Sequence, residues 1–148
     1  MLHKTKYSSG AKWEDIVGYS RAVKVGNTVL ITGTTAVDEN GVIVAVNDAY
    51  NQARYIFMKI QKYLEQAGAR LEDVVRNRIY VKDISKWEII GKAHAEFFGE
   101  IKPCCTMVEV KKFVDKDMLV EVETEAIIIN PPVEQEQETF FINEESNQ

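Results

Sequence analysis

The chain has 148 residues and a mass of 16.9 kDa, which suits one domain with a hydrophobic core of its own. Its composition, 45% hydrophobic and 28% charged, argues against intrinsic disorder, and no 18-residue apolar run exists that could span a membrane. The net charge of −5 argues against nucleic acid as a partner, because nucleic-acid binding needs a basic surface. The two cysteines are adjacent and no apolar stretch follows the first lysines, so a cytoplasmic protein is predicted.

The first half of the chain predicts a hairpin followed by a helix. Residues 19–25 alternate in polarity, Gly26-Asn27 is a turn signal, and residues 28–34 are rich in β-branched side chains. From Asp48, a suitable N-cap, apolar residues recur with helical spacing until Gly68 ends the pattern. The predicted buried face of this helix comprises Ala53, Ile56, Phe57, Ile60, Leu64 and Ala67.

The second half predicts three strands and a second helix. Residues 74–81, 105–110 and 119–129 have strand character. Ser85 with Glu88 three residues later forms a capping-box pattern that starts a helix ending at Gly99. The predicted apolar face of that helix comprises Trp87, Ile90, His94, Phe97 and Phe98. The expected order is β-β-α-β-α-β-β, and the fold class is α+β, with two helices on one face of a mixed sheet.

One face of the predicted sheet is strongly charged. Side chains alternate along a strand, so Val75, Asn77, Ile79 and Val81 are expected to share the helix-covered face. The far face is then predicted to hold Arg76, Arg78, Tyr80, Glu109, Glu121, Glu123 and Glu125. Such a face is either solvated or an interface between chains with Arg–Glu pairs across strands. The apolar Leu119 and Ile127 among these charges favour an interface.

The charge also divides the chain into a domain, residues 1–130, and an acidic tail, residues 131–148. The tail contains five glutamates and no Lys or Arg, and Pro131-Pro132 begins it. A mobile acidic terminus is one interpretation. The apolar segment 140–142 favours the other, in which the two aromatic rings are buried against protein.

Few residues stand out chemically. Gly33 between Thr32 and Thr34 predicts either a simple bulge or a close approach of the backbone to a ligand. His94 is predicted to be a hydrogen-bonded core residue, and Cys105, which has no assignable base, is predicted to be inert. No metal-ligand spacing, phosphate-binding loop or nucleophile elbow is present, so neither a metal nor another cofactor is expected. Composition and spacing alone therefore predict an α+β domain with one charged sheet face.

Four strings in order resemble the Rid/YjgF family of reactive intermediate deaminases: GYSRAVKVGNTVLITGTTAV, EQAGARLEDVVRNRIYVKDI, AEFFGEIKP and MLVEVETEA. The resemblance covers roughly residues 17–129. It implies a chorismate-mutase-like fold and a homotrimer whose sheets form a central barrel, with small-molecule clefts between subunits. Active members hydrolyse 2-imino and enamino acids to 2-keto acids and ammonia, without a metal or an organic cofactor.

The resemblance also implies roles for individual residues. Glu121 matches the glutamate that positions the attacking water, and Tyr19 matches the aromatic residue that lines the cleft. Gly33 matches the glycine of a Ser-Gly-Gln motif, with Thr34 in place of the glutamine. Cys105 stands where the family has the arginine that binds the substrate carboxylate. Either of two other arginines, Arg21 or Arg78, is a candidate replacement for this cation; packing and surface charge are the alternative roles of Tyr19 and Arg21.

Two functions are compatible with this site. The protein either hydrolyses an imine, an enamine or a related electrophile, or it is a non-catalytic trimer that binds a small metabolite in the same clefts. If the family geometry holds, Cys105 points into the cleft on the same face as Glu121, within reach of Tyr19 and Gly33. Cys105→Arg is then expected to raise the rate of 2-imino acid hydrolysis at least about tenfold, which needs roughly 1.4 kcal/mol of transition-state binding.

Overall fold

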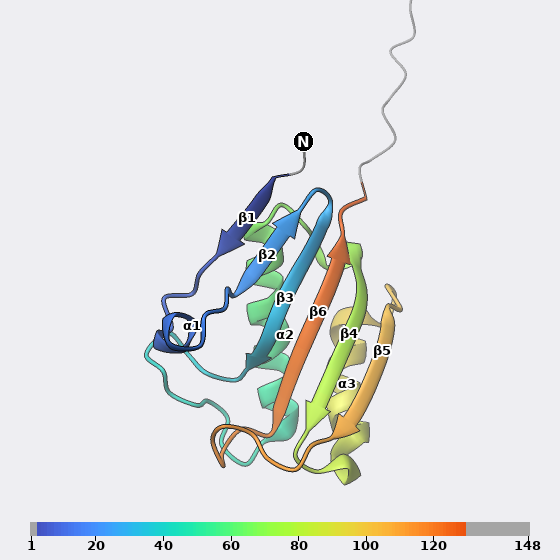
Figure 1. Ribbon diagram of the computed structural model, residues 1–148. Coiled ribbons are helices and arrows are strands. Elements are labelled where there is room, and N and C mark those ends of the chain that lie inside the picture. The colour runs from blue at the N-terminus through green and yellow to red at the C-terminus, as the bar shows by residue number, and fades with distance from the viewer. Residues whose placement is uncertain (1–2, 130–148) are drawn as a thin grey trace, which may run out of the picture.

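The computed structural model describes residues 3–129 and shows one mixed six-stranded sheet with helices behind it (Figure 1). The strand order is β1-β2-β3-β6-β4-β5, all neighbours being antiparallel except β4 and β5. This confirms the α+β class. The elements are β1 (Lys4–Tyr7), α1 (Lys12–Val17), β2 (Ala22–Val25), β3 (Thr28–Thr35), α2 (Ala49–Gln66), β4 (Val74–Val81), α3 (Trp87–Phe98), β5 (Cys104–Glu109) and β6 (Val120–Ile127), with 3₁₀ turns at Leu71–Asp73 and Ile84–Lys86.

The core lies between the sheet and the pair α2 and α3, which cover the same face of it (Figure 1). Helix α2 begins as predicted: the Asp48 carboxylate accepts a hydrogen bond of 2.9 Å from the backbone N–H of Asn51. Beyond its last turn Gly68 has a φ of 81°, a left-handed conformation that favours glycine. Phe57 is fully buried from this helix and meets Phe98 of α3 edge to face, at 5.5 Å between ring centres. None of the helices within residues 3–129 is long and apolar enough to cross a membrane.

The alternation along β6 is confirmed over the whole strand. Val120, Val122, Thr124 and Ala126 are buried beneath the helices. The three glutamates between them lie on the opposite face, which neither α2 nor α3 covers (Figure 1). We call this the open face of the sheet.

Two residues, Val75 and Glu109, were predicted on the wrong face of the sheet. Simple alternation along a strand does not take account of a β-bulge or of the register between strands. The β4–β6 register shifts between Val74 and Arg76, so Val74 is buried and Val75 is exposed, not the reverse. Glu109 pairs in register with the buried Val81, which puts it on the helix side of β5 rather than on the open face. Its carboxylate accepts a hydrogen bond from the backbone N–H of Ile84 at 3.2 Å.

The start of α3 also differs from the prediction. Ser85 does not cap the helix; instead its N–H and hydroxyl both donate to the Asp83 carboxylate, which caps the preceding 3₁₀ turn. Helix α3 therefore begins only at Trp87, and the Trp87 side chain is 55% exposed rather than part of the apolar face. The Asp83 carboxylate lies two residues before the Ser85 N–H, and at this spacing a carboxylate accepts a hydrogen bond in a turn more strongly than a hydroxyl does. The turn at Asp83 therefore forms in place of a cap by Ser85.

Two short elements, β1 and α1, were not predicted. Every residue from Lys4 to Lys6 is exposed, so β1 carries no alternation of polar and apolar side chains. Helix α1 has only six residues and leaves Ile16 and Val17 exposed, so it has no buried stripe. The acidic tail, including the segment 140–142, lies outside the described residues.

His94 is a core residue, as predicted. The Asn77 amide nitrogen donates to its Nε2 at 3.0 Å, while the Asn77 oxygen accepts from the Thr124 hydroxyl at 2.7 Å. The imidazole stacks on Phe98 with 4.8 Å between ring centres. Burial lowers the pKa of His94 below its ordinary value of 6.5. The neutral imidazole is thus the form that the fold accommodates.

We expect the contribution of His94 to the free energy of unfolding to decrease as the pH falls from 7 to 5.5. The folded protein resists protonation of His94 while the unfolded chain takes up the proton near pH 6.5. At a pH above the pKa of His94 in the unfolded chain, this difference in proton uptake does not affect stability. At a pH below that pKa, it destabilises the folded protein. Urea denaturation at pH 7.0, 6.0 and 5.5 measures the effect. His94→Gln can still accept from Asn77 but cannot titrate, so its stability should change less over this range; an equal change in both proteins would contradict the assignment.

Candidate functional site

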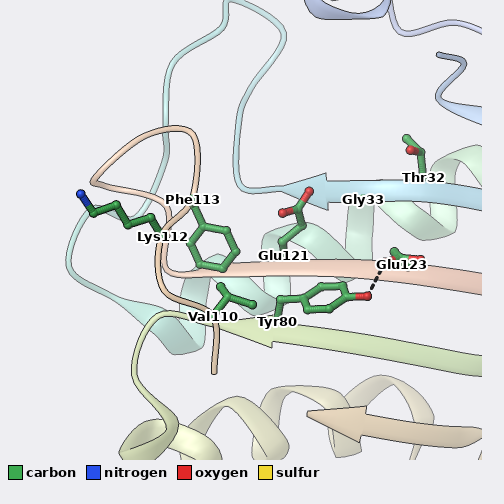
Figure 2. A pocket seen from close by; sticks show the side chains of 8 residues that line it. All are labelled: Thr32, Gly33, Tyr80, Val110, Lys112, Phe113, Glu121 and Glu123. Atoms are coloured by element: carbon green, nitrogen blue, oxygen red, sulfur yellow. Dashed lines mark hydrogen bonds between the residues drawn. The ribbon is translucent and has the colours of Figure 1, made fainter. Parts of the chain in front are cut away.

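A cleft of about 420 Å³ opens on the open face of the sheet, near the ends of β3 and β4 and the start of β6 (Figure 2). Strands β3, β4 and β6 supply part of its lining, and the segment between β5 and β6 supplies the rest. The lining residues are Thr32, Gly33, Tyr80, Val110, Lys112, Phe113, Glu121 and Glu123. The cleft therefore combines two carboxylates, a phenol and a lysine with an apolar wall.

Gly33 and Glu121, both predicted as site residues, meet in this cleft. The β3–β6 register shifts between Ile31 and Thr34, so Gly33 lies in a β-bulge, as one reading of the sequence predicted. The Glu121 side chain occupies the space beside it: a Cβ added at Gly33 would overlap the carboxylate oxygen Oε1 and lie 3.1 Å from Cδ. The glycine is thus needed for the close approach of the Glu121 carboxylate.

The surroundings of Glu121 disfavour the charged form of its carboxylate. Burial raises the pKa of Glu121 most, the nearby Glu123 raises it further, and Arg21 lowers it. No Lys, Arg or His nitrogen among residues 3–129 lies within 4.0 Å of it. A carboxylate with a raised pKa accepts a proton more readily near neutral pH, which is the property that a general base needs.

Glu123 is held by neighbours on β4. The Tyr80 hydroxyl donates to Glu123 Oε1 at 2.5 Å, and this hydrogen bond raises the pKa of Tyr80 (Figure 2). Arg78, a candidate substrate-binding residue, is on the same face but pairs with Glu125 at 3.0 Å and with Glu123 at 4.0 Å. It does not line the cleft.

Arg21 and Thr34, two further candidates, lie behind the bulge. Arg21 is buried and donates to the Gly33 carbonyl oxygen at 2.9 Å and to the Thr34 hydroxyl at 3.5 Å. Thr34 is completely buried, and its hydroxyl donates to the Thr32 carbonyl oxygen at 2.8 Å. Within the protomer, both residues support the shape of the bulge and neither lines the cleft.

Tyr19 and Cys105 are also outside the cleft of the protomer. Tyr19 is half-buried, and its backbone N–H donates to the Glu14 carbonyl oxygen at 3.0 Å. Cys105 pairs in register with the buried Asn77, whereas Glu121 pairs with Tyr80 on the open face. The expectation that Cys105 and Glu121 share a face of the sheet is therefore wrong within the protomer, whereas a gain in rate with Cys105→Arg stays a prediction about a cleft between subunits. Burial raises the pKa of the Cys105 thiol, which agrees with an inert side chain.

The sequence did not reveal the apolar wall of the cleft, Val110 and Phe113. Val110 was predicted as the last residue of a strand that ends at Glu109 in the structure, and Phe113 lies in the mostly polar stretch between two predicted strands. The far end of this segment is anchored to α2: Gln52 donates to the Asp117 carbonyl oxygen at 2.8 Å and accepts from the Leu119 N–H at 2.9 Å. The only sequence signal for this wall was the presence of two apolar side chains beside Lys111 and Lys112.

Comparison with known proteins identifies the family. The sequence profile of the family described as Endoribonuclease L-PSP matches residues 9–128. The chain belongs to this family. A crystal structure of a member of the YjgF family from Mycobacterium tuberculosis is 44% identical, covers 85% of this chain and all of that chain, and superimposes with a TM-score of 0.78. This confirms the Rid/YjgF resemblance.

Two further relatives cover most of the domain. The Escherichia coli YjgF structure is 27% identical, spans 86% of this chain and all of that chain, and has a TM-score of 0.74. A protein of Acinetobacter baylyi named 3-aminoacrylate deaminase RutC is 35% identical over 108 residues, which are 73% of this chain and 85% of that protein. The fold described above is thus the YjgF fold. Among residues 3–129, no cluster of three or more His, Cys, Asp or Glu side chains could hold a metal ion.

Proposed function

We propose that the cleft hydrolyses an imine or enamine, releasing ammonia and a carbonyl compound. The observation that carries the proposal is Glu121, whose carboxylate has a raised pKa and lies against Gly33 in the lining of the cleft. The relationship to a protein named as an aminoacrylate deaminase supports the same chemistry.

The reaction needs one group that handles protons. The Glu121 carboxylate takes a proton from water as the water oxygen bonds to the carbon of the protonated imine, and the C=N electron pair moves to the nitrogen. The nitrogen of the resulting carbinolamine receives the proton that Glu121 holds. The C–N bond then breaks, and the leaving ammonia takes the hydroxyl proton, which gives the carbonyl compound and an ammonium ion. One water is consumed, and the oxygen of the carbonyl product comes from it. Glu121 is thus base in the first step and acid in the second.

The activity is tested with an imine that a second enzyme generates in the assay mixture. An oxidase that converts an amine or amino acid to its imine is coupled to this protein, and semicarbazide traps the imine that remains. We expect the protein to lower the amount of trapped imine and to raise the rate of ammonia release. Saturable binding of the imine's stable analogues without any change in ammonia release would instead support the non-catalytic binding protein.

We also propose that the open face is the interface of a homotrimer. Arg76 and Arg78 both pair with Glu125 on this face, at 3.6 and 3.0 Å. Leu30 and Ile127 on the same face are each 47% exposed, and burying them between subunits would be favourable. Small-molecule clefts such as the one around Glu121 would then be completed by a neighbouring subunit.

We predict a mass of three times the 16.9 kDa chain in solution, measured by light scattering. Leu30→Glu places a second carboxylate opposite Glu125 and should shift the population toward monomers. Met58→Glu is the control, because Met58 is 57% exposed on α2, away from the open face. A monomeric wild-type protein, or a Leu30→Glu protein that stays as large as the control, would contradict the proposed interface.

A further inference from the structure

We propose that the preferred substrate of the cleft is a cationic imine that has no carboxylate group. Such compounds form when a primary amine, rather than an amino acid, is oxidised. The inference rests on the proposed imine hydrolysis and names the chemical class on which it acts.

The charges that line the cleft are mainly negative. Glu121 and Glu123 are two residues apart on β6 and therefore face the same side of the sheet (Figure 2). Tyr80 contributes a hydroxyl but no positive charge, and its proton is already donated to Glu123. Glu121 has no ion-pair partner among residues 3–129. A ligand in this cleft meets one carboxylate that is unpaired and a second that is shared with Arg78 at 4.0 Å.

The positively charged side chains near the cleft either contact other groups or extend away from Glu121. The Arg21 guanidinium is buried behind the bulge and donates to Gly33 and Thr34. Arg78 is closest to Glu125. The Lys112 side chain extends away from Glu121, beyond Phe113 (Figure 2). The cleft of one protomer thus offers no guanidinium fork for a substrate carboxylate.

Electrostatics then decides between two imines that differ only in a carboxylate. A 2-imino acid adds a negative charge beside Glu121 and Glu123, and like charges at short range in a half-buried site repel strongly. A protonated imine without a carboxylate adds only a positive charge and is attracted. Val110 and Phe113 supply an apolar wall for its carbon chain.

The chemistry also gives the reaction class that supplies the substrate. Oxidation of a primary amine to the imine comes first, by a separate oxidase. Water then adds to the protonated imine, R–CH=NH₂⁺, and the C–N bond breaks, which gives the aldehyde R–CHO and NH₄⁺. Glu121 moves the proton as described above, and no further oxidant or reductant is consumed in this step.

A matched pair of substrates tests the inference. An amine oxidase acting on 2-phenylethylamine and an amino-acid oxidase acting on phenylalanine produce imines with the same benzyl side chain. Each rate of ammonia release is compared with the rate in buffer alone at pH 7.5. We expect at least a tenfold larger acceleration for the amine-derived imine. A larger acceleration for the imino acid would overturn the inference while leaving imine hydrolysis intact.

Variants locate the cause of the preference. Glu123→Gln keeps an oxygen to accept from Tyr80 but removes a charge, so the preference should fall several-fold. Glu65→Gln removes a charge from the exposed surface of α2, outside the cleft and away from the open face, and should leave the preference unchanged. If neither imine is hydrolysed, imine hydrolysis fails as the function, and calorimetry with two inert probes still tests the charge argument. The phenylethylammonium ion should then bind more tightly than 3-phenylpropionate, and the reverse order would overturn the inference.

Discussion

Glu121→Gln is expected to lower the rate of imine hydrolysis by about two to four orders of magnitude, the usual contribution of a positioned acid–base group. The amide has nearly the same shape as the carboxylate, so it fills the space beside Gly33 without a proton-accepting charge. Burial already makes the charged form of Glu121 unfavourable, so the variant should be at least as stable as the wild type. Ammonia release under saturating imine measures the rate, and thermal unfolding measures the stability.

Glu65→Gln is the control for this substitution. Glu65 is an exposed residue of α2, on the helix-covered side of the sheet, and it does not line the cleft. Its loss should leave the rate of ammonia release within about twofold of the wild type, because substitutions on the exposed surface away from a site have small effects. If Glu121→Gln retains full activity, Glu121 is not the group that moves the proton.

The second large effect is expected from Gly33→Ala, which should lower the rate by about a hundredfold while changing the melting temperature little. The added Cβ overlaps the Glu121 carboxylate, whose displacement by an ångström or so removes it from its productive position. The displaced atoms are the far end of a flexible side chain, so the strain is relieved by rotation rather than by unfolding. Activity and stability should therefore separate in this variant.

Gly91→Ala tests whether any glycine substitution has this effect. Gly91 lies in α3, and nothing is within 4 Å of the position of its Cβ. Alanine there should keep the activity and raise the stability by up to about 1 kcal/mol, because it favours helix. A fully active Gly33→Ala protein would show that the close approach of Glu121 to β3 is not required for the reaction.

The local pattern of the sequence was sufficient for the long elements and for one side of the site. Helix α2 carries a buried stripe and an Asp cap, and β6 alternates through its full length, so both were predictable. The same alternation placed Glu121 and Glu123 on one face, and the glycine within a β-branched run indicated either a bulge, which the structure shows, or a close approach to a ligand. The buried stripe, the helix cap, the alternation and the bulge all depend on residues close to one another in the sequence, so they can be recognised from the sequence alone.

Only the tertiary structure decided which residues share the cleft. A bulge in β4 exchanges Val74 and Val75 between faces, and the parallel register of β5 turns Cys105 away from Glu121. The wall formed by Val110 and Phe113 depends on how the segment after β5 folds back over the sheet. Register and loop path are set by contacts between strands far apart in sequence, where a shift of one residue reverses the face of every side chain and leaves no local pattern to read.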